Sequence, residues 1–251
     1  MSRAGLAFAL LASLAPASGA IAEPEAGGEH LRLETAQGIV HLWQPADYDP
    51  ATGGLVIYVH GYFANVDQAW REHALAQQFS RSRENALFVA PEAPAREREP
   101  VRWTSLQALL DAVSRERPLP KGPLVVMGHS GAFRTILPWL SDRRLRHLVL
   151  LDGLYGRELP FHAWLRRGRG PSRKQLVVVA SETSRKAERF AARYRAAARR
   201  PAIPEDASQF TRKERSAPVL VMRSQYEHMD IVTNGLVIPL LLQLMPLPPL
   251  P

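Results

Sequence analysis

Six short apolar runs recur along the chain, and each is a nearly continuous series of Val, Leu and Ile rather than an alternation with polar residues. A continuous run of about five residues is typical of a strand that is buried on both faces of a parallel sheet. We therefore expect strands at residues 55–60, 87–91, 124–129, 147–152, 175–180 and 218–223.

Segments with apolar residues at helical spacing separate these runs. Helices are expected at residues 67–82, 103–116, 131–142, 184–200 and 234–245. In the second of these segments, Thr104 and Gln107 have the spacing of a capping box. The alternation of strand and helix predicts an α/β fold, with a mostly parallel sheet covered by helices on both faces. Residues 29–45 contain two shorter apolar segments and predict an antiparallel hairpin at one edge.

The N-terminus has the pattern of an export signal. Arg3 precedes an apolar run at residues 4–15, and Ala20-Ile21-Ala22 matches a small-residue cleavage site. The run is too short to span a bilayer. We expect a signal peptide at residues 1–22, with an uncleaved N-terminal anchor as the alternative, and an exported protein that is periplasmic or secreted. A single domain at residues 23–251, with a short insertion at about 156–174, would follow.

Composition narrows the classes of function. The 251 residues are 46% hydrophobic, which is enough for one sizeable core. The chain has no cysteine, so disulfides, a thiol nucleophile and thiolate zinc sites are excluded. The net charge of +8 is concentrated at residues 166–174 and 184–200, but the second segment has an apolar stripe and predicts a solvated surface helix. No zinc-finger spacing or RNA-binding motif is present, and we expect no nucleic-acid partner.

One motif carries chemistry. Gly128-His129-Ser130-Gly131-Ala132 ends an expected strand and opens an expected helix, which is the context of a G-x-S-x-G nucleophile turn. The flanking glycines permit a sharp turn that exposes the serine hydroxyl, and the helix directs N–H groups toward it. We therefore predict that Ser130 is a nucleophile. The alternative is an ordinary turn between a strand and a helix.

With this turn the chain resembles the α/β-hydrolase family over residues 31 to 245. Three motifs follow in the family's order: VIYVHGYF with His60-Gly61, GHSGA with Ser130, and SQYEHMDIVTNG with His228. The resemblance implies a three-layer α/β fold with a sheet of about eight strands. It also implies acyl-transfer chemistry at the carboxyl ends of the strands, without a metal or an organic cofactor.

The proton acceptor is expected to be His228. A serine hydroxyl must lose its proton as it attacks, and the reference pKa of histidine, about 6.5, allows it to accept and return that proton. Among the eight histidines only His228 has the order and the loop placement; His60 is expected to shape its loop and His129 to pack beside the serine. The family pattern implies that the backbone N–H groups of Tyr62 and Gly131 form the oxyanion hole.

Two carboxylates at strand ends are candidates for the acid that orients the histidine. The commoner family arrangement favours Glu182, and the arrangement of some family lipases favours Asp152. Glu182 begins a helix, where an acidic side chain is stabilising without any catalytic role. Asp152 closes a buried strand, where a carboxylate is costly unless the fold uses it. We predict Asp152 and keep Glu182 as the alternative.

These residues predict a serine hydrolase that cleaves a carboxylic ester, or less readily an amide, through an acyl-enzyme. The substrate would be a small molecule or an acyl group derived from the cell envelope. Two alternatives stay open: an acyltransferase that uses the same triad, and a non-catalytic module that binds an anionic polymer through the basic segments. The polar, proline-broken segment at residues 90–100 is interpreted as a simple loop after a strand.

Overall fold

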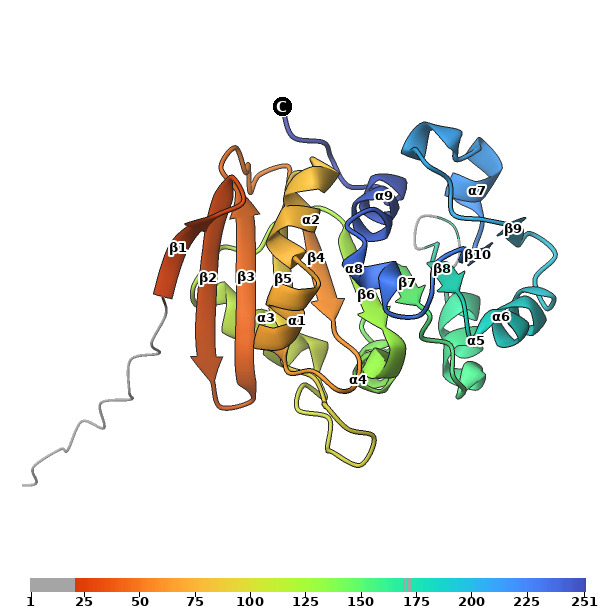
Figure 1. Ribbon diagram of the computed structural model, residues 1–251, viewed down its shortest axis with the longest axis horizontal. Helices are drawn as coiled ribbons and strands as arrows, with labels where there is room; N and C mark the ends of the chain where they lie inside the picture. Colours follow the sequence, from red (N-terminus) through yellow and green to blue (C-terminus); the bar gives the residue numbers. More distant parts are fainter. Residues whose placement is uncertain (1–20, 169, 171–172) are drawn as a thin grey trace, which may run out of the picture.

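A ten-stranded sheet forms the centre of the computed structural model, which describes residues 21–168, 170 and 173–251 (Figure 1). Its strands lie in the order β1-β2-β3-β5-β4-β6-β7-β8-β10-β9. In this spatial order, the seven strands from β5 to β9 pair in parallel with their neighbours. The strands β1, β2 and β3 pair antiparallel and form one edge, and β3 is also antiparallel to β5. The strands are β1 (Ile21–Glu25), β2 (Gly28–Thr35), β3 (Gly38–Pro45), β4 (Gly54–Val59), β5 (Ala86–Pro91), β6 (Leu124–His129), β7 (His147–Leu151), β8 (Gln175–Ala180), β9 (Ala198–Arg200) and β10 (Val219–Arg223).

The predicted fold class is confirmed, with ten strands in place of about eight. The six apolar runs are β4 to β8 and β10, and every residue of β4, β5, β6 and β8 is buried. The predicted edge hairpin is β2 and β3. The two additional strands are β1, beside that hairpin, and the three-residue β9 at the opposite edge. β9 lies inside the helix predicted at 184–200, because pairing with β10 favours extended backbone there.

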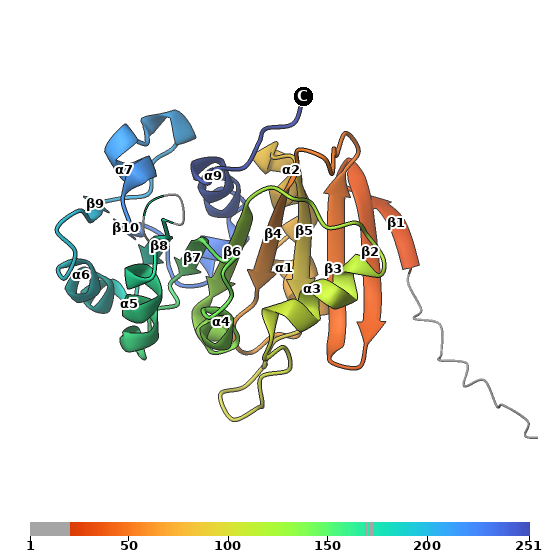
Figure 2. The same cartoon turned by 180° about the vertical axis from the view of Figure 1, so that it is seen from behind.

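Helices cover both faces of the sheet, and Figures 1 and 2 show the two layers from opposite sides. One layer contains α1, α2, α8 and α9, and the other contains α3, α4, α5 and α6. The 3-10 helices η1 (Ser130–Ala132) and η3 (Ala207–Gln209) are also among the described elements. The α-helices are α1 (Val66–Glu72), α2 (Leu75–Ser82), α3 (Leu106–Ser114), α4 (Phe133–Trp139), α5 (Glu158–Arg166), α6 (Ser184–Ala191), α7 (Arg212–Ser216), α8 (Asp230–Thr233) and α9 (Val237–Leu244).

Two other predicted helices differ from the observed ones in where they begin or break. The segment at 67–82 is two helices, because Ala74 adopts a left-handed conformation with φ of 47° and separates α1 from α2. In the segment at 103–116, Ser105 caps α3 by accepting the Ala108 N–H, so the predicted capping box at Thr104 is wrong. In both cases the apolar positions predicted the helical segment, and the local backbone decided where it begins or breaks.

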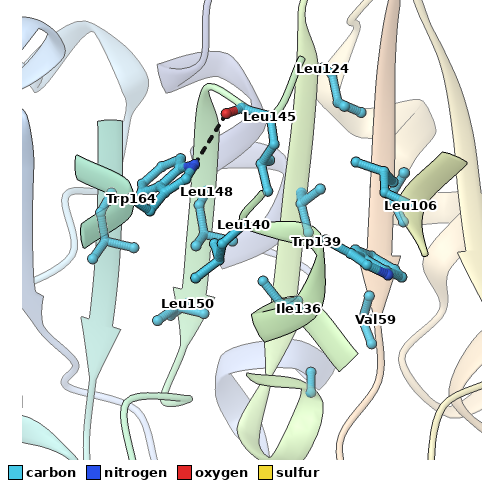
Figure 3. Packing of buried hydrophobic residues seen from close by; sticks show 14 of the residues in the cluster. Val59, Leu106, Leu124, Ile136, Trp139, Leu140, Leu145, Leu148, Leu150 and Trp164 are labelled. Carbon is cyan, nitrogen blue, oxygen red and sulfur yellow. Dashed lines mark hydrogen bonds between the residues drawn. The ribbon is translucent and has the colours of Figure 1, made fainter. Parts of the chain in front are cut away.

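Successive residues of the central strands point into two separate cores. Ile57 of β4 belongs to the core beneath α3 to α6, and the adjacent Tyr58 belongs to the core beneath α1, α2, α8 and α9. Figure 3 shows the first core, in which Trp139 of α4 packs toward the sheet and Trp164 of α5 donates its ring N–H to the Leu145 carbonyl, at 3.2 Å. This packing fixes α4, and therefore the turn that precedes it, against the strand ends.

Most of the predicted signal peptide, residues 1–20, lies outside the described residues. Its last two residues, Ile21 and Ala22, belong to β1. The described residues contain no helix that is long and apolar enough to cross a membrane. The predicted insertion at 156–174 contains α5.

Candidate active site

The predicted nucleophile lies in a strained turn directly after β6. Ser130 has φ of 51°, a left-handed conformation that residues other than glycine rarely adopt. The turn is also tightly packed: a Cβ added at Gly128 would lie 2.3 Å from Ile136 Cδ1, and one at Gly131 would lie 2.6 Å from the Tyr62 ring. A Cβ at either position would therefore collide with a packed side chain, so close approach of neighbouring groups favours the two flanking glycines from which the sharp turn was predicted.

An aspartate holds the imidazole of the predicted base. Asp152 follows β7, His228 lies in the loop after β10, and His228 Nδ1 is 2.8 Å from Asp152 Oδ2. Asp152 is fully buried and accepts the backbone N–H groups of Ser181, Glu182 and Thr183, at 2.9 to 3.1 Å, together with the Thr183 hydroxyl at 2.6 Å. The loop after β8 therefore closes around the carboxylate.

These contacts set the charges of the pair. Burial alone would raise the pKa of Asp152, but the hydrogen bonds from His228, Thr183 and Ser181 hold that pKa well below its usual range. The pKa of His228 is raised, mainly by its hydrogen bond to Asp152 and further by the charges of Asp152 and Glu182. Asp152 is therefore ionised at neutral pH, and Nδ1 of His228 carries the proton of their hydrogen bond, which leaves Nε2 as the basic atom.

Ser130 and His228 line one cavity of about 750 Å³ at the carboxyl ends of the parallel strands. Among the described residues no hydrogen bond joins the Ser130 hydroxyl to His228. Contacts of this kind are often long in enzymes without substrate and shorten in the complex. Four aromatic residues also line the cavity, Tyr62, Phe63, Phe133 and Tyr155, and the charged lining residues in the described chain are Glu72, Glu97 and Glu182.

The alternative acid, Glu182, takes a different place. Its backbone N–H donates to Asp152, while its carboxylate accepts the Tyr155 hydroxyl at 2.9 Å. Asp152, rather than Glu182, thus contacts the imidazole of His228 directly. Ligand atoms of Asp152, Glu182 and His228 lie within 4.8 Å of one another, and both oxygens of Asp152 already accept N–H or O–H donors.

The loop after β4 brings the first predicted oxyanion donor to the cavity. His60 fastens this loop, since its Nε2 accepts the Ala93 N–H at 3.0 Å and its Nδ1 donates to the Gly61 carbonyl at 2.8 Å. The Tyr62 ring packs on Gly131, the second predicted donor. Within the described chain the Tyr62 N–H has no hydrogen-bond acceptor, whereas the next N–H, of Phe63, donates to Ala95.

His129 packs beside the site, as expected. Its Nε2 lies 3.2 Å from the His228 carbonyl, and its ring centroid lies 4.5 Å from that of His228. Burial, followed by the nearby His228, lowers the pKa of His129 to about 3, so its ring is neutral at neutral pH. His129 therefore supports the loop that carries the predicted base.

The residues that brace the loop after β4 were not predicted from the sequence. The segment at 90–100, interpreted as a simple loop, contacts it through Ala95. Arg134 of α4 joins the two loops: it donates to the Tyr62 hydroxyl, to the Arg96 carbonyl and to the Glu99 carbonyl, at 2.8 to 3.3 Å. An arginine on a helix and a polar loop are common features, and no pattern in the sequence indicates that they meet.

Comparison with known proteins identifies the family to which this fold belongs. Residues 56–245 match the model of the family described as "Alpha/beta hydrolase family". No curated protein matches the chain.

Solved structures with a similar fold include several esterases. An S-formylglutathione hydrolase from Agrobacterium tumefaciens has 9% identity and a TM-score of 0.55, covering 89% of this chain and 97% of that one. A feruloyl esterase module from Clostridium thermocellum has 11% identity and a TM-score of 0.55, covering 90% and 89%. An S-formylglutathione hydrolase from Staphylococcus aureus has 12% identity and a TM-score of 0.54, covering 92% and 100%. The fold is shared over nearly the whole chain, and from the family match the chain belongs to the alpha/beta hydrolase family.

Proposed function

We propose that the protein is a serine hydrolase that cleaves carboxylic esters through an acyl-enzyme. Ser130 attacks the carbonyl carbon, His228 accepts the serine proton at Nε2 and returns it to the leaving alcohol, and Asp152 fixes the imidazole tautomer. The observation that carries this proposal is the 2.8 Å contact of the buried Asp152 with His228, which lines the same cavity as Ser130. Water then releases the acid from the acyl-enzyme by the same proton transfers.

Attack creates a positive charge on His228 and a negative charge on the substrate carbonyl oxygen, and the site can stabilise both. The imidazolium formed on His228 lies against Asp152, whose depressed pKa keeps it ionised. The oxyanion formed on the substrate would accept the N–H groups of Tyr62 and Gly131, and losing one donor of this kind typically costs about 3 kcal/mol of transition-state stabilisation. Neither step needs a metal or an organic cofactor.

The cavity lining favours uncharged or cationic esters with an apolar group. Aromatic residues supply the apolar surface, and Phe63 stands out because it is 94% exposed and held at φ of 70°. The charged lining residues of the described cavity are glutamates, which repel an anionic acyl group. Esterases among the structures of similar fold make ester cleavage the first reaction to test.

The test is covalent labelling with a fluorophosphonate probe, together with hydrolysis of p-nitrophenyl esters of graded acyl length. We expect wild type to be labelled and Ser130→Ala to lose both labelling and turnover. Ser141→Ala is the matched control, because Ser141 is an exposed serine near the end of the same helical segment, outside the cavity lining. Labelling that persists in Ser130→Ala would refute the assignment of the nucleophile.

A further inference from the structure

Tyr155 is the residue beside the proposed triad that the mechanism has not used. It lies three residues after Asp152, and its hydroxyl donates to Glu182 Oε2 at 2.9 Å. The same hydroxyl is 3.4 Å from His228 Nδ1, and the two rings meet nearly edge to face, with centroids 6.2 Å apart. The phenol thus lies between a second carboxylate and the imidazole.

Lys186 contacts both the backbone and the ring of Tyr155. Lys186 of α6 donates to the Tyr155 carbonyl, and its ammonium lies 5.6 Å from the centre of the phenol ring. Burial, followed by the hydrogen bond to Glu182, raises the pKa of Tyr155. Tyr155 therefore stays protonated at neutral pH and remains a donor to Glu182, and it lines the same cavity as Ser130.

The carboxylates of Asp152 and Glu182, which follow adjacent strands, both lie near His228 but contact it differently. Asp152, after β7, contacts the imidazole directly, and Glu182, after β8, reaches it through the phenol of Tyr155. The backbone N–H of Glu182 also donates to Asp152, so the two acids share one loop. A charge at Glu182 acts on the imidazolium that forms during attack, because opposite charges nearby favour the protonated histidine.

We propose that Tyr155 and Glu182 form a second hydrogen-bonded pair beside the triad, in which Glu182 fixes the Tyr155 hydroxyl next to the imidazole of His228. The inference rests on the proposed function, since it assigns the pair to the same reaction. Tyr155 is a positioning residue in this arrangement, because its hydroxyl lies 3.4 Å from His228 Nδ1 and the residue lines the same cavity as Ser130. Glu182 supplies orientation and a second negative charge.

Several other titratable groups lie near His228, Tyr155 or Glu182, and their titration could contribute to the pH dependence of the reaction rate. Asp152 and His129 contact the imidazole, and Lys186 contacts Tyr155. Glu227 and Asp230 flank His228 in sequence. Burial keeps His129 neutral above a pH of about 3. Its titration therefore does not overlap the acidic limb of the rate–pH profile, in which the rate falls as His228 becomes protonated.

The test measures the rate of fluorophosphonate labelling against pH, with p-nitrophenyl acetate hydrolysis as the second assay. In Glu182→Gln, loss of the charge lowers the pKa of His228, so the acidic limb moves to lower pH by roughly half a unit, the size expected for a partly exposed charge pair. In Tyr155→Phe, loss of the hydroxyl lowers the plateau rate and kcat about 10-fold, with little change in KM. Glu188→Gln is the matched control: it removes an equal charge from α6, where Glu188 pairs with Arg199 outside the cavity lining.

The double variant and the conservative variant complete the test. If the two residues act as a pair, Tyr155→Phe with Glu182→Gln has the plateau rate of Tyr155→Phe alone. Glu182→Asp keeps the charge, and we expect it to retain the acidic limb of wild type. An unchanged limb in Glu182→Gln, or additive losses in the double variant, would overturn the pairing while wild type is still labelled. Absence of labelling in wild type would instead reject the proposed function.

Discussion

The backbone at Ser130 is strained where the proposed reaction begins. Its φ of 51° is left-handed, a conformation that costs a residue with a Cβ about 1–2 kcal/mol. Asp152 has φ of 46°, so a second proposed triad residue is also left-handed. Strained residues of this kind concentrate at functional sites and persist only where surrounding packing fixes them. Here the packed glycines of the turn and the core beneath α4 supply that constraint.

This strain predicts an unusual order of stabilities. Ser130→Gly removes the Cβ and relieves the left-handed backbone, whereas Ser130→Ala removes the hydroxyl and keeps the strain. We expect Ser130→Gly to be more stable than Ser130→Ala by about 1 kcal/mol, although glycine is usually the less stable of the two. Urea unfolding of both inactive variants measures the difference. An alanine variant that is the more stable would show that the turn is not strained.

At the same scale, a residue with a local signature could be selected from the sequence as a candidate. Ser130 lies between flanking glycines, and His228 follows the last predicted strand. The choice between Asp152 and Glu182 stayed open because both end adjacent parallel strands, and only side-chain direction separates them. The partnership of Tyr155 with Glu182 joins residues 27 positions apart through one hydroxyl, and no pattern of residue types predicts it.

At the scale of elements, hydrophobic periodicity predicted the strands because burial on both faces leaves a continuous apolar run. It failed where a few backbone angles or one edge pairing decide the structure. The left-handed Ala74 divides one predicted helix into α1 and α2, and pairing with β10 makes residues 198–200 a strand. Contacts between loops are even harder to predict from the sequence. The segment at 90–100 supports the cavity through single hydrogen bonds, which no sequence pattern indicates.

Arg134 connects three elements and provides a test of that support. It links α4 to the loop after β4 and to the loop after β5, through donors to Tyr62, Arg96 and Glu99. A lysine keeps the charge but cannot reproduce the planar set of donors. We expect Arg134→Lys to lower kcat about 10-fold, because a small displacement of the oxyanion donor is costly, and to lower unfolding free energy by only about 1 kcal/mol.

Steady-state hydrolysis of p-nitrophenyl acetate and urea unfolding check this prediction. Arg143→Lys is the matched control, since Arg143 is an exposed arginine shortly after α4. Equal kcat values for the two variants would mean that Arg134 does not position the oxyanion loop.

For the whole molecule, several imidazoles are buried as neutral groups. Burial is the main cause that lowers the pKa of His41 and His73 to about 4 and that of His129 to about 3. Burial also acts on an acid, raising the pKa of Glu84 to about 8. The fold therefore binds fewer protons than the unfolded chain at the histidines and more at Glu84, and these two effects oppose each other.

The balance predicts loss of stability in mild acid. Between a pH of about 6.5, where unfolded histidines titrate, and about 4, these three histidines bind protons mainly after unfolding, so stability falls as pH falls. Burial also lowers the pKa values of His30, His147 and His162, and these rings act in the same direction. In the same window Glu84 is protonated only in the fold, and it cancels about one of the three protons. The raised pKa of His228 does not alter this window, because below about 6.5 that ring is protonated in both states.

His41, His73 and His129 together with Glu84 give a net difference of about two protons, which corresponds to a loss of at least roughly 2 to 3 kcal/mol per pH unit between pH 6 and pH 5. Urea unfolding at these two values measures it. His73→Gln removes one buried imidazole and should reduce the slope by about one proton, whereas Glu84→Gln removes the opposing carboxyl and should increase it by the same amount. Because the two substitutions shift the slope in opposite directions, a general effect of weakening the fold cannot produce both results. A slope unchanged by His73→Gln would mean that this ring is protonated in the folded protein.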